Sequence, residues 1–64
     1  MITVSAFLSY AKDVLIMKFD PKRGGSYDGL YCIKDFVNLY GEKHVKWFST
    51  TNGNGYLVIE LEEE

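Results

Sequence analysis

The hydrophobic and polar positions at the start of the chain alternate. Residues 2 to 10 place Ile, Val, Ala, Leu and Tyr at the even positions and Thr, Ser, Phe and Ser at the odd ones. This period of two is typical of a half-buried strand, and we predict a first strand here. The dense apolar run at residues 14 to 19 predicts a second strand, which could form a hairpin with the first. Asp20-Pro21 should end it, because proline has no N–H for a ladder.

A spacing of three or four residues replaces the alternation after Asp28. The residues that share this helical face are Ile33, Phe36, Val37 and Tyr40. The pattern predicts a helix over about residues 29 to 40, with Asp28 as its N-cap and Gly41 as a left-handed stop. The segment up to Ile33, which contains Tyr31, could equally continue as a strand.

The last third of the chain returns to strand patterns around a Thr-Asn-Gly-Asn-Gly turn. Asn-Gly supplies the positive φ that tight hairpins need, so residues 44 to 61 predict a hairpin. We expect Val45 and Trp47 to lie on one side of its first strand, and Lys46 and Phe48 on the other. In the second strand the expected core residues are Leu57, Ile59 and Leu61.

Tyr56 and Val58 then fall on the opposite side of that strand, where we expect Phe48 beside them. A sheet that is apolar on both faces, with one helix to cover it, needs a second cover, which could be another copy or a target protein. We therefore predict an α+β fold: a small antiparallel sheet of about four strands in β-β-α-β-β order with one helix. Residues 1 to 64 form one domain, and residues 60 to 64 form its acidic end.

The length of 64 residues allows one core that is too small for high stability on its own. Cys32 is the single cysteine, and with His44 it is the only soft metal ligand, so we expect no disulfide, no structural zinc and no cofactor. Self-association remains, and we expect a homodimer. Because the sequence lacks a membrane-spanning apolar run and a signal-peptide pattern, we expect a cytoplasmic protein without membrane contact.

The chemistry of the residues disfavours an enzyme. One histidine, one cysteine and scattered acids give no acid-base pair or activated nucleophile, and no phosphate-binding glycine motif occurs. A single-stranded nucleic-acid binder is a stronger alternative, since four basic residues could contact phosphates and four aromatic residues could stack on bases. These are Lys22, Arg23, Lys43 and Lys46, with Tyr27, Tyr31, Trp47 and Tyr56. The pI of about 5.2 disfavours it.

Charge is unevenly distributed along the chain. The net charge is −2, yet four of the nine acids fall in residues 60 to 64, so residues 1 to 59 carry seven basic and five acidic side chains, a balance of +2. The acidic end is explained most simply as a solubility feature.

The helical segment also suggests a binding site. Phe36 and Tyr40 lie one turn apart, and a second helix copy opposite them would make an aromatic groove for an inserted aliphatic side chain. The simpler alternative is that both rings pack on the chain's own sheet.

Two segments in this region carry a resemblance. Asp28-Gly29-Leu30 and residues 35 to 41, Asp-Phe-Val-Asn-Leu-Tyr-Gly, resemble the small dimeric uracil-DNA glycosylase inhibitors of protein-primed Bacillus phages. That family has an acid where this chain has Val37. The resemblance implies a phage protein that acts in the host cytoplasm as a DNA mimic and captures a leucine of its bacterial DNA repair enzyme target.

By matched position, the resemblance places Phe36 and Tyr40 in the walls of the pocket, Leu39 behind them and Asp35 as an acidic contact. Glu42 could replace the missing acid. On this hypothesis Phe36→Ala abolishes inhibition and leaves the fold largely intact. Other hypotheses remain open: a phage-type host-takeover or anti-defence inhibitor of another nucleic-acid enzyme, direct nucleic-acid binding, and an oligomerising accessory domain.

Overall fold

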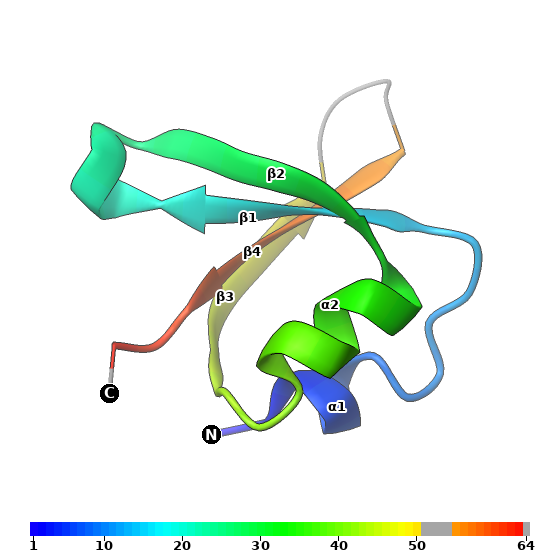
Figure 1. The fold of residues 1–64 in the computed structure, drawn as a ribbon. Helices are drawn as coiled ribbons and strands as arrows, with labels where there is room; N and C mark the ends of the chain where they lie inside the picture. The colour runs from blue at the N-terminus through cyan, green and yellow to red at the C-terminus, as the bar shows by residue number, and fades with distance from the viewer. Residues whose placement is uncertain (51–54, 64) are drawn as a thin grey trace.

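The computed structural model of the protein describes residues 1–50 and 55–63, without the side chains of Arg23 and Ser26. Its elements are α1 (Val4–Phe7), β1 (Leu15–Asp20), the short 3-10 turn η1 (Pro21–Arg23), β2 (Ser26–Cys32), α2 (Ile33–Tyr40), β3 (Val45–Thr50) and β4 (Tyr56–Leu61). The strands form one sheet in the order β2-β1-β4-β3 (Figure 1). The predicted α+β class is confirmed, and so is the β-β-α-β-β order from β1 to β4. The prediction of one helix is wrong, because α1 precedes β1.

The sheet is mixed, whereas a purely antiparallel sheet was predicted. β1 pairs antiparallel with β2, and β3 with β4, but the two central strands β1 and β4 run parallel. Parallel neighbours need a long crossover connection, and here the chain passes through β2, α2 and β3 between them. The predicted hairpin at residues 44 to 61 is confirmed in β3 and β4. Its Asn-Gly turn at residues 51 to 54 lies outside the described residues.

The predicted first strand at residues 2 to 10 is wrong, because most of this segment is the short helix α1 and the turn after it. The Thr3 side chain caps α1 by accepting a 3.1 Å hydrogen bond from the backbone N–H of Ala6. Val4 and Leu8 are buried one helical turn apart, while Tyr10 is exposed. Val4 and Leu8 fit both the alternation of a strand and the four-residue spacing of a helix, so the alternation did not distinguish the two. The hairpin partner of β1 is β2.

The predicted start of the main helix is also wrong, and the strand alternative is confirmed. Residues 28 to 32 belong to β2, and α2 begins at Ile33 after Cys32. Gly29 has a φ of 75° at an irregularity in the pairing with β1, where a bulge separates the partners of Met17 and Lys18. Asp28 and Gly29, residue types that also occur at helix starts, therefore lie at a bulge inside β2.

Gly41 ends α2 in a right-handed conformation, so the predicted left-handed stop is wrong. The glycine is needed because α1 approaches closely. A Cβ at this position would lie 2.5 Å from the Val37 carbonyl oxygen and 2.6 Å from Ser5 Oγ. The backbone N–H of Ser5 also donates a 3.0 Å hydrogen bond to the Gly41 carbonyl.

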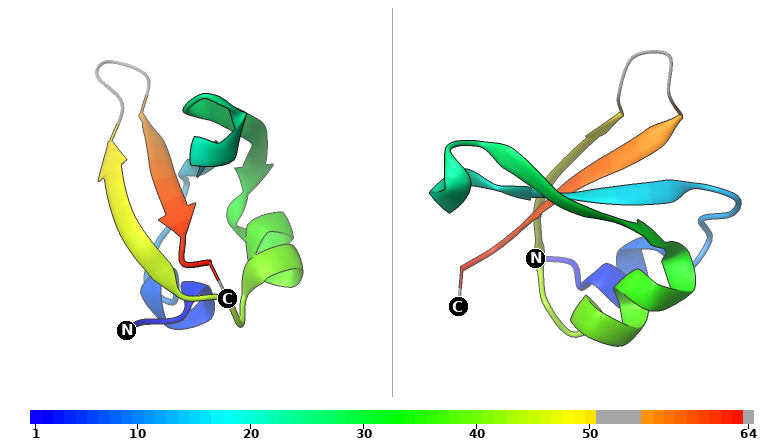
Figure 2. Two further views of the ribbon diagram at one scale, coloured as in Figure 1. Left: turned by 90° about the vertical axis from the view of Figure 1, so that its left-hand side faces the viewer. Right: turned by 45° about the horizontal axis from the view of Figure 1, so that its top comes forward.

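Both helices lie on the same side of the sheet, which leaves the other face uncovered by any described helix (Figures 1 and 2). The core forms between the helices and the sheet. Its buried members are Val4, Leu8, Ile16, Phe36, Val45 and Ile59, with Leu57 and Leu61 packed against them as predicted. Val58 is buried apart from this cluster, on the opposite face as predicted. No helix within the described residues is long and apolar enough to cross a membrane.

Candidate functional site

Phe36 is a core residue. Its side chain is 0% exposed, and its ring packs against Tyr31 of β2 with a centroid distance of 5.5 Å. Phe36 therefore packs on the chain's own sheet, as the simpler alternative from the sequence has it. Phe36 therefore offers no surface to a partner in this conformation. Its burial argues against the expectation that Phe36→Ala leaves the fold intact, because the substitution would leave a cavity in the core.

Tyr40 lies at the edge of the core and is half-buried. Its ring contacts Phe36 at a centroid distance of 5.0 Å, and Lys18 Nζ lies 5.5 Å from the ring centroid. A hydrogen bond with Tyr40 is the main cause that raises the pKa of Tyr31, with burial second. Tyr40 is thus fixed by contacts with the core and with β1 while part of its ring stays accessible.

Leu39 is the apolar side chain that α2 presents outward, with 60% of its surface exposed. Asp35 lies four residues before it and Glu42 three residues after it, and both are exposed. Since Gly41 keeps right-handed helical angles, these spacings place the three side chains on one face. We call Asp35, Leu39 and Glu42 the acid-leucine stripe.

A hollow of about 390 Å³ adjoins the C-terminal end of this stripe, and its lining includes Leu39, Tyr40 and Glu42. The structure therefore brings three of the five predicted site residues together at one hollow. Asp35 lies a helical turn away, and Phe36 lies beneath, in the core. Leu39 lies outside and Phe36 behind it, the reverse of the expected positions.

A second candidate surface is the sheet face opposite the helices. β3 has a bulge at Lys46 in its pairing with β4. Val45 lies opposite Leu61, and Trp47, two residues later, lies opposite Glu60, only one residue before Leu61. This bulge moves Trp47 to the outer face and Phe48 to the helix side, where the Phe48 ring lies 4.7 Å from that of Phe7. The predicted sides of Trp47 and Phe48 are therefore wrong. The outer sheet face includes the apolar and aromatic side chains of Leu15, Met17, Phe19, Tyr27, Leu30, Trp47 and Val58.

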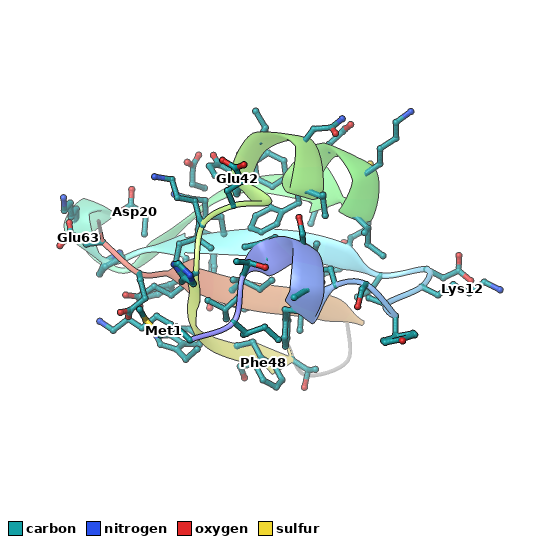
Figure 3. The ribbon with its side chains drawn as sticks, turned by 90° about the horizontal axis from the view of Figure 1, so that it is seen from below. Met1, Lys12, Asp20, Glu42, Phe48 and Glu63 are labelled. Carbon is teal, nitrogen blue, oxygen red and sulfur yellow. The ribbon has the colours of Figure 1, made fainter. Side chains whose placement is uncertain are left out.

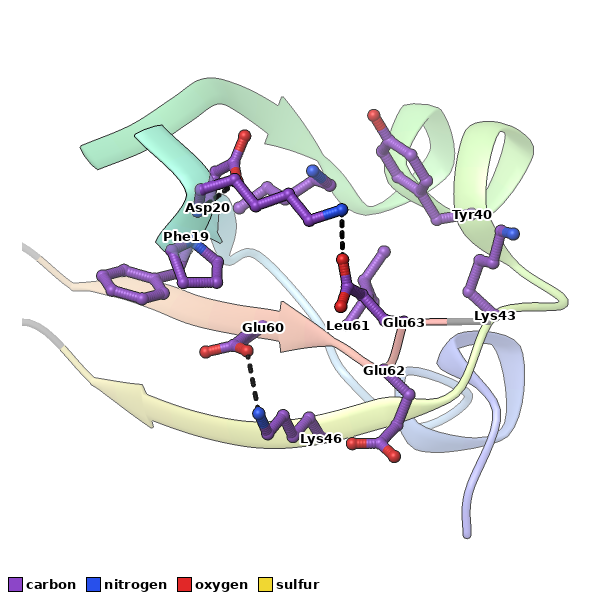
Figure 4. A pocket seen from close by; sticks show the side chains of 12 residues that line it. Phe19, Asp20, Tyr40, Lys43, Lys46, Glu60, Leu61, Glu62 and Glu63 are labelled. Atoms are coloured by element: carbon purple, nitrogen blue, oxygen red, sulfur yellow. Dashed lines mark hydrogen bonds and ion pairs between the residues drawn. The ribbon is translucent and has the colours of Figure 1, made fainter. Parts of the chain in front are cut away.

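Three rings form a row across the outer face. Phe19 of β1 lies at centroid distances of 5.7 Å from Tyr27 of β2 and 5.3 Å from Trp47 of β3. Tyr27 and Trp47 are 49% and 36% exposed. The middle ring of this aromatic row, Phe19, also forms part of the wall of a cleft of about 390 Å³ (Figure 4).

The cleft is rich in charge. It is lined by four lysines and four acids, which are Lys18, Lys22, Lys43 and Lys46, and Asp20, Glu60, Glu62 and Glu63. Glu60 is 7% exposed, and its carboxylate accepts a 2.7 Å hydrogen bond from Trp47 Nε1 and lies 3.4 Å from Lys46 Nζ. Glu60 is thus a structural member of β4, whereas the sequence placed it in an acidic end.

Glu63 follows β4 and pairs with Lys22 of η1 across the cleft (Figure 4). A hydrogen bond and the opposite charge raise the pKa of Lys22 and lower the pKa of Glu63. Both side chains are about three-quarters exposed, so solvent screens this pair strongly.

Sequence patterns indicated no binding role for Lys18 or Phe19, and they assigned Glu60 both to the last strand and to the acidic end. Phe19 and Glu60 lay inside predicted strands, and the alternation of apolar residues could not show that β1 and β4 are neighbours. Within the described residues no group of three or more potential ligands from His, Cys, Asp and Glu is placed to hold a metal ion.

Comparisons with known proteins returned no matching family model, no matching curated protein and no matching solved structure.

Proposed function

We propose that this protein is a stoichiometric inhibitor that binds a bacterial uracil-DNA glycosylase through the acid-leucine stripe. The observation that carries the proposal is the exposed Leu39 between two exposed carboxylates at a hollow. An apolar anchor flanked by acids would fit the groove of a DNA-binding enzyme. Such a groove carries cationic side chains that contact phosphates, and in the proposed target it also carries the leucine that enters DNA. The choice of target rests on the resemblance of residues 28 to 41.

In this mechanism the negative charges of Asp35 and Glu42 approach the cationic DNA-binding groove of the enzyme. Leu39 and the accessible part of Tyr40 pack against the leucine that the glycosylase would otherwise insert into DNA. Phe36 supports Tyr40 from the core and does not contact the target. The inhibitor works by occupying the groove, and it needs no cofactor.

The active form in this proposal is a homodimer joined through the end of the outer sheet face that carries Leu15 and Leu30, which leaves the aromatic row at the other end of β1 uncovered. Apolar side chains such as Leu15 and Leu30 are 40% and 49% exposed there, and a small domain gains stability when a second copy covers such a face. A dimer would also present two acid-leucine stripes. Leu30→Lys is expected to shift the mass in sedimentation equilibrium from dimer to monomer, and an unchanged mass would exclude this interface.

The direct test is a uracil-excision assay in which the protein is titrated against a bacterial glycosylase on uracil-containing duplex DNA. The parent protein should abolish excision near equimolar ratio. Leu39→Asp should weaken inhibition by about a hundredfold, as the loss of a hot-spot side chain does. Tyr10→Asp is the matched control, since Tyr10 is 99% exposed and lies outside the stripe. Full excision with a large excess of the parent would reject the proposed target.

A further inference from the structure

The charged cleft exists because the two central strands separate. β1 and β4 pair in parallel as far as Lys18 and Ile59, and each strand continues for two more residues. The carboxyl ends of these two parallel strands therefore diverge at the cleft, in the way that the strand ends of doubly wound α/β sheets open a ligand crevice. The cleft therefore lies where the sheet itself makes a binding site, at a distance in sequence from the acid-leucine stripe.

The end of the chain neutralises this cleft. The four lysines come from β1, η1, the loop after α2, and β3, and they are matched by four acids. Two of those acids, Glu62 and Glu63, belong to the segment after β4, and Glu63 pairs with Lys22. Without these two carboxylates the lining would carry four positive and two negative charges.

Glu60 has a different position from Glu62 and Glu63. It is buried within β4 and is held by Trp47 and Lys46. Glu60 is therefore held by the sheet, whereas Glu62 and Glu63 lie beyond the end of β4. Lys22, which pairs with Glu63, and Lys43, which lines the same cleft, are side chains that an external anion would meet.

The cleft is continuous with the aromatic row, because Phe19 belongs to both. A basic groove beside exposed rings is the arrangement that binds single strands, since phosphates contact lysines while bases stack on aromatic faces. We propose that the cleft and the aromatic row bind single-stranded nucleic acid, and that Glu62 and Glu63 occupy the phosphate position until the strand displaces them.

The test measures fluorescence polarisation of a labelled short oligothymidylate with the full chain at low salt. The variant Glu62→Gln/Glu63→Gln should bind about tenfold more tightly than the parent, because two carboxylates no longer compete for the lysines. The matched control is Asp35→Asn/Glu42→Gln, which changes the net charge equally but lies on α2 and beyond it. This control should stay within about twofold of the parent.

Two further variants separate the phosphate and base contacts in the Glu62→Gln/Glu63→Gln background. Lys22→Gln/Lys43→Gln should weaken binding and reduce the slope of log K against log salt by about two. Tyr27→Ser should weaken binding without changing that slope. Lys12→Gln is the lysine control, because Lys12 lies at the end of the molecule opposite Asp20 and Glu63 (Figure 3).

Equal strengthening by Glu62→Gln/Glu63→Gln and by the α2 control would overturn the proposal, because net charge alone would then explain the effect. Absence of oligonucleotide binding by Glu62→Gln/Glu63→Gln at low salt would overturn it as well. Neither result bears on inhibition of a glycosylase, which is measured with Leu39 variants on a different surface.

Discussion

The indole Nε1 of Trp47 donates a 2.7 Å hydrogen bond to Oε1 of Glu60 across the β3–β4 pair. The bulge at Lys46 makes this contact possible, because it brings Lys46 and Trp47 to the same carboxylate. A buried carboxylate costs free energy unless its partners satisfy it. The bulge therefore does two things: it stabilises Glu60 inside the sheet and adds Trp47 to the aromatic row.

Trp47→Phe should lower the free energy of unfolding by about 1 to 3 kcal/mol, because it removes a hydrogen bond to a buried charged group. Lys46→Gln should cost less than about 1 kcal/mol, since the Lys46 side chain is half-exposed and its ion pair is screened. Urea unfolding followed by circular dichroism measures both. A larger loss for Lys46→Gln would show that the ion pair, and not the indole, holds Glu60.

Phe36→Ala should destabilise the fold by about 3 to 5 kcal/mol, because it empties a fully buried ring position between α2 and β2. In a domain of this size such a loss leaves little folded protein. Thermal unfolding of the variant tests this. Leu39→Ala is the control on the same helix and should change stability by less than about 0.5 kcal/mol. A cooperative transition near the parent temperature for Phe36→Ala would contradict the core assignment.

Features of this fold that depend on neighbouring residues in the sequence could be predicted, and features that depend on contacts between distant segments could not. The β3–β4 hairpin and the core face of β4 were predictable, because Asn-Gly turns and strict alternation act locally. The helix α1 was not, since its burial depends on contacts with α2 and β3 that no local pattern shows. The side of Trp47 was missed for a related reason: a one-residue bulge inverts every later position.

The candidate site shows the same division. Helical spacing placed Phe36 and Tyr40 one turn apart, and the structure has their rings in contact. Leu39 entered only through the resemblance, and the binding role that the resemblance implies stays a prediction. The apolar face that the spacing defined contains Phe36 and not Leu39, in agreement with their exposures of 0% and 60%. The pocket position expected for Phe36 came from the resemblance and not from the spacing. The charged cleft depends on β1 and β4 being neighbours, a relation across about forty residues that alternation does not encode.

Gly41→Ala should lower the free energy of unfolding by about 1 to 3 kcal/mol, because the new methyl group would overlap the Val37 carbonyl and Ser5 Oγ. To relieve the overlap, α1 would have to move away from the end of α2. Urea unfolding gives the loss. Asn38→Ala serves as the control because it adds a good helix former at an exposed position of α2, and it should be neutral or slightly stabilising. A neutral Gly41→Ala would mean that α1 does not pack against Gly41 in solution.

The pairing of Glu63 with Lys22 predicts a specific titration. The hydrogen bond from Lys22 lowers the pKa of Glu63, so this carboxyl should remain ionised at a pH where an unpaired glutamate has begun to protonate. In Lys22→Gln the midpoint should rise toward the ordinary value, while Lys12→Gln should leave it unchanged. Side-chain carboxyl NMR shifts followed against pH measure the midpoint directly. High salt should reduce the difference between parent and Lys22→Gln, because the pair is exposed. If Glu63 titrates identically in the parent and in Lys22→Gln, the end of the chain does not occupy the cleft, and its proposed competition with nucleic acid loses its basis.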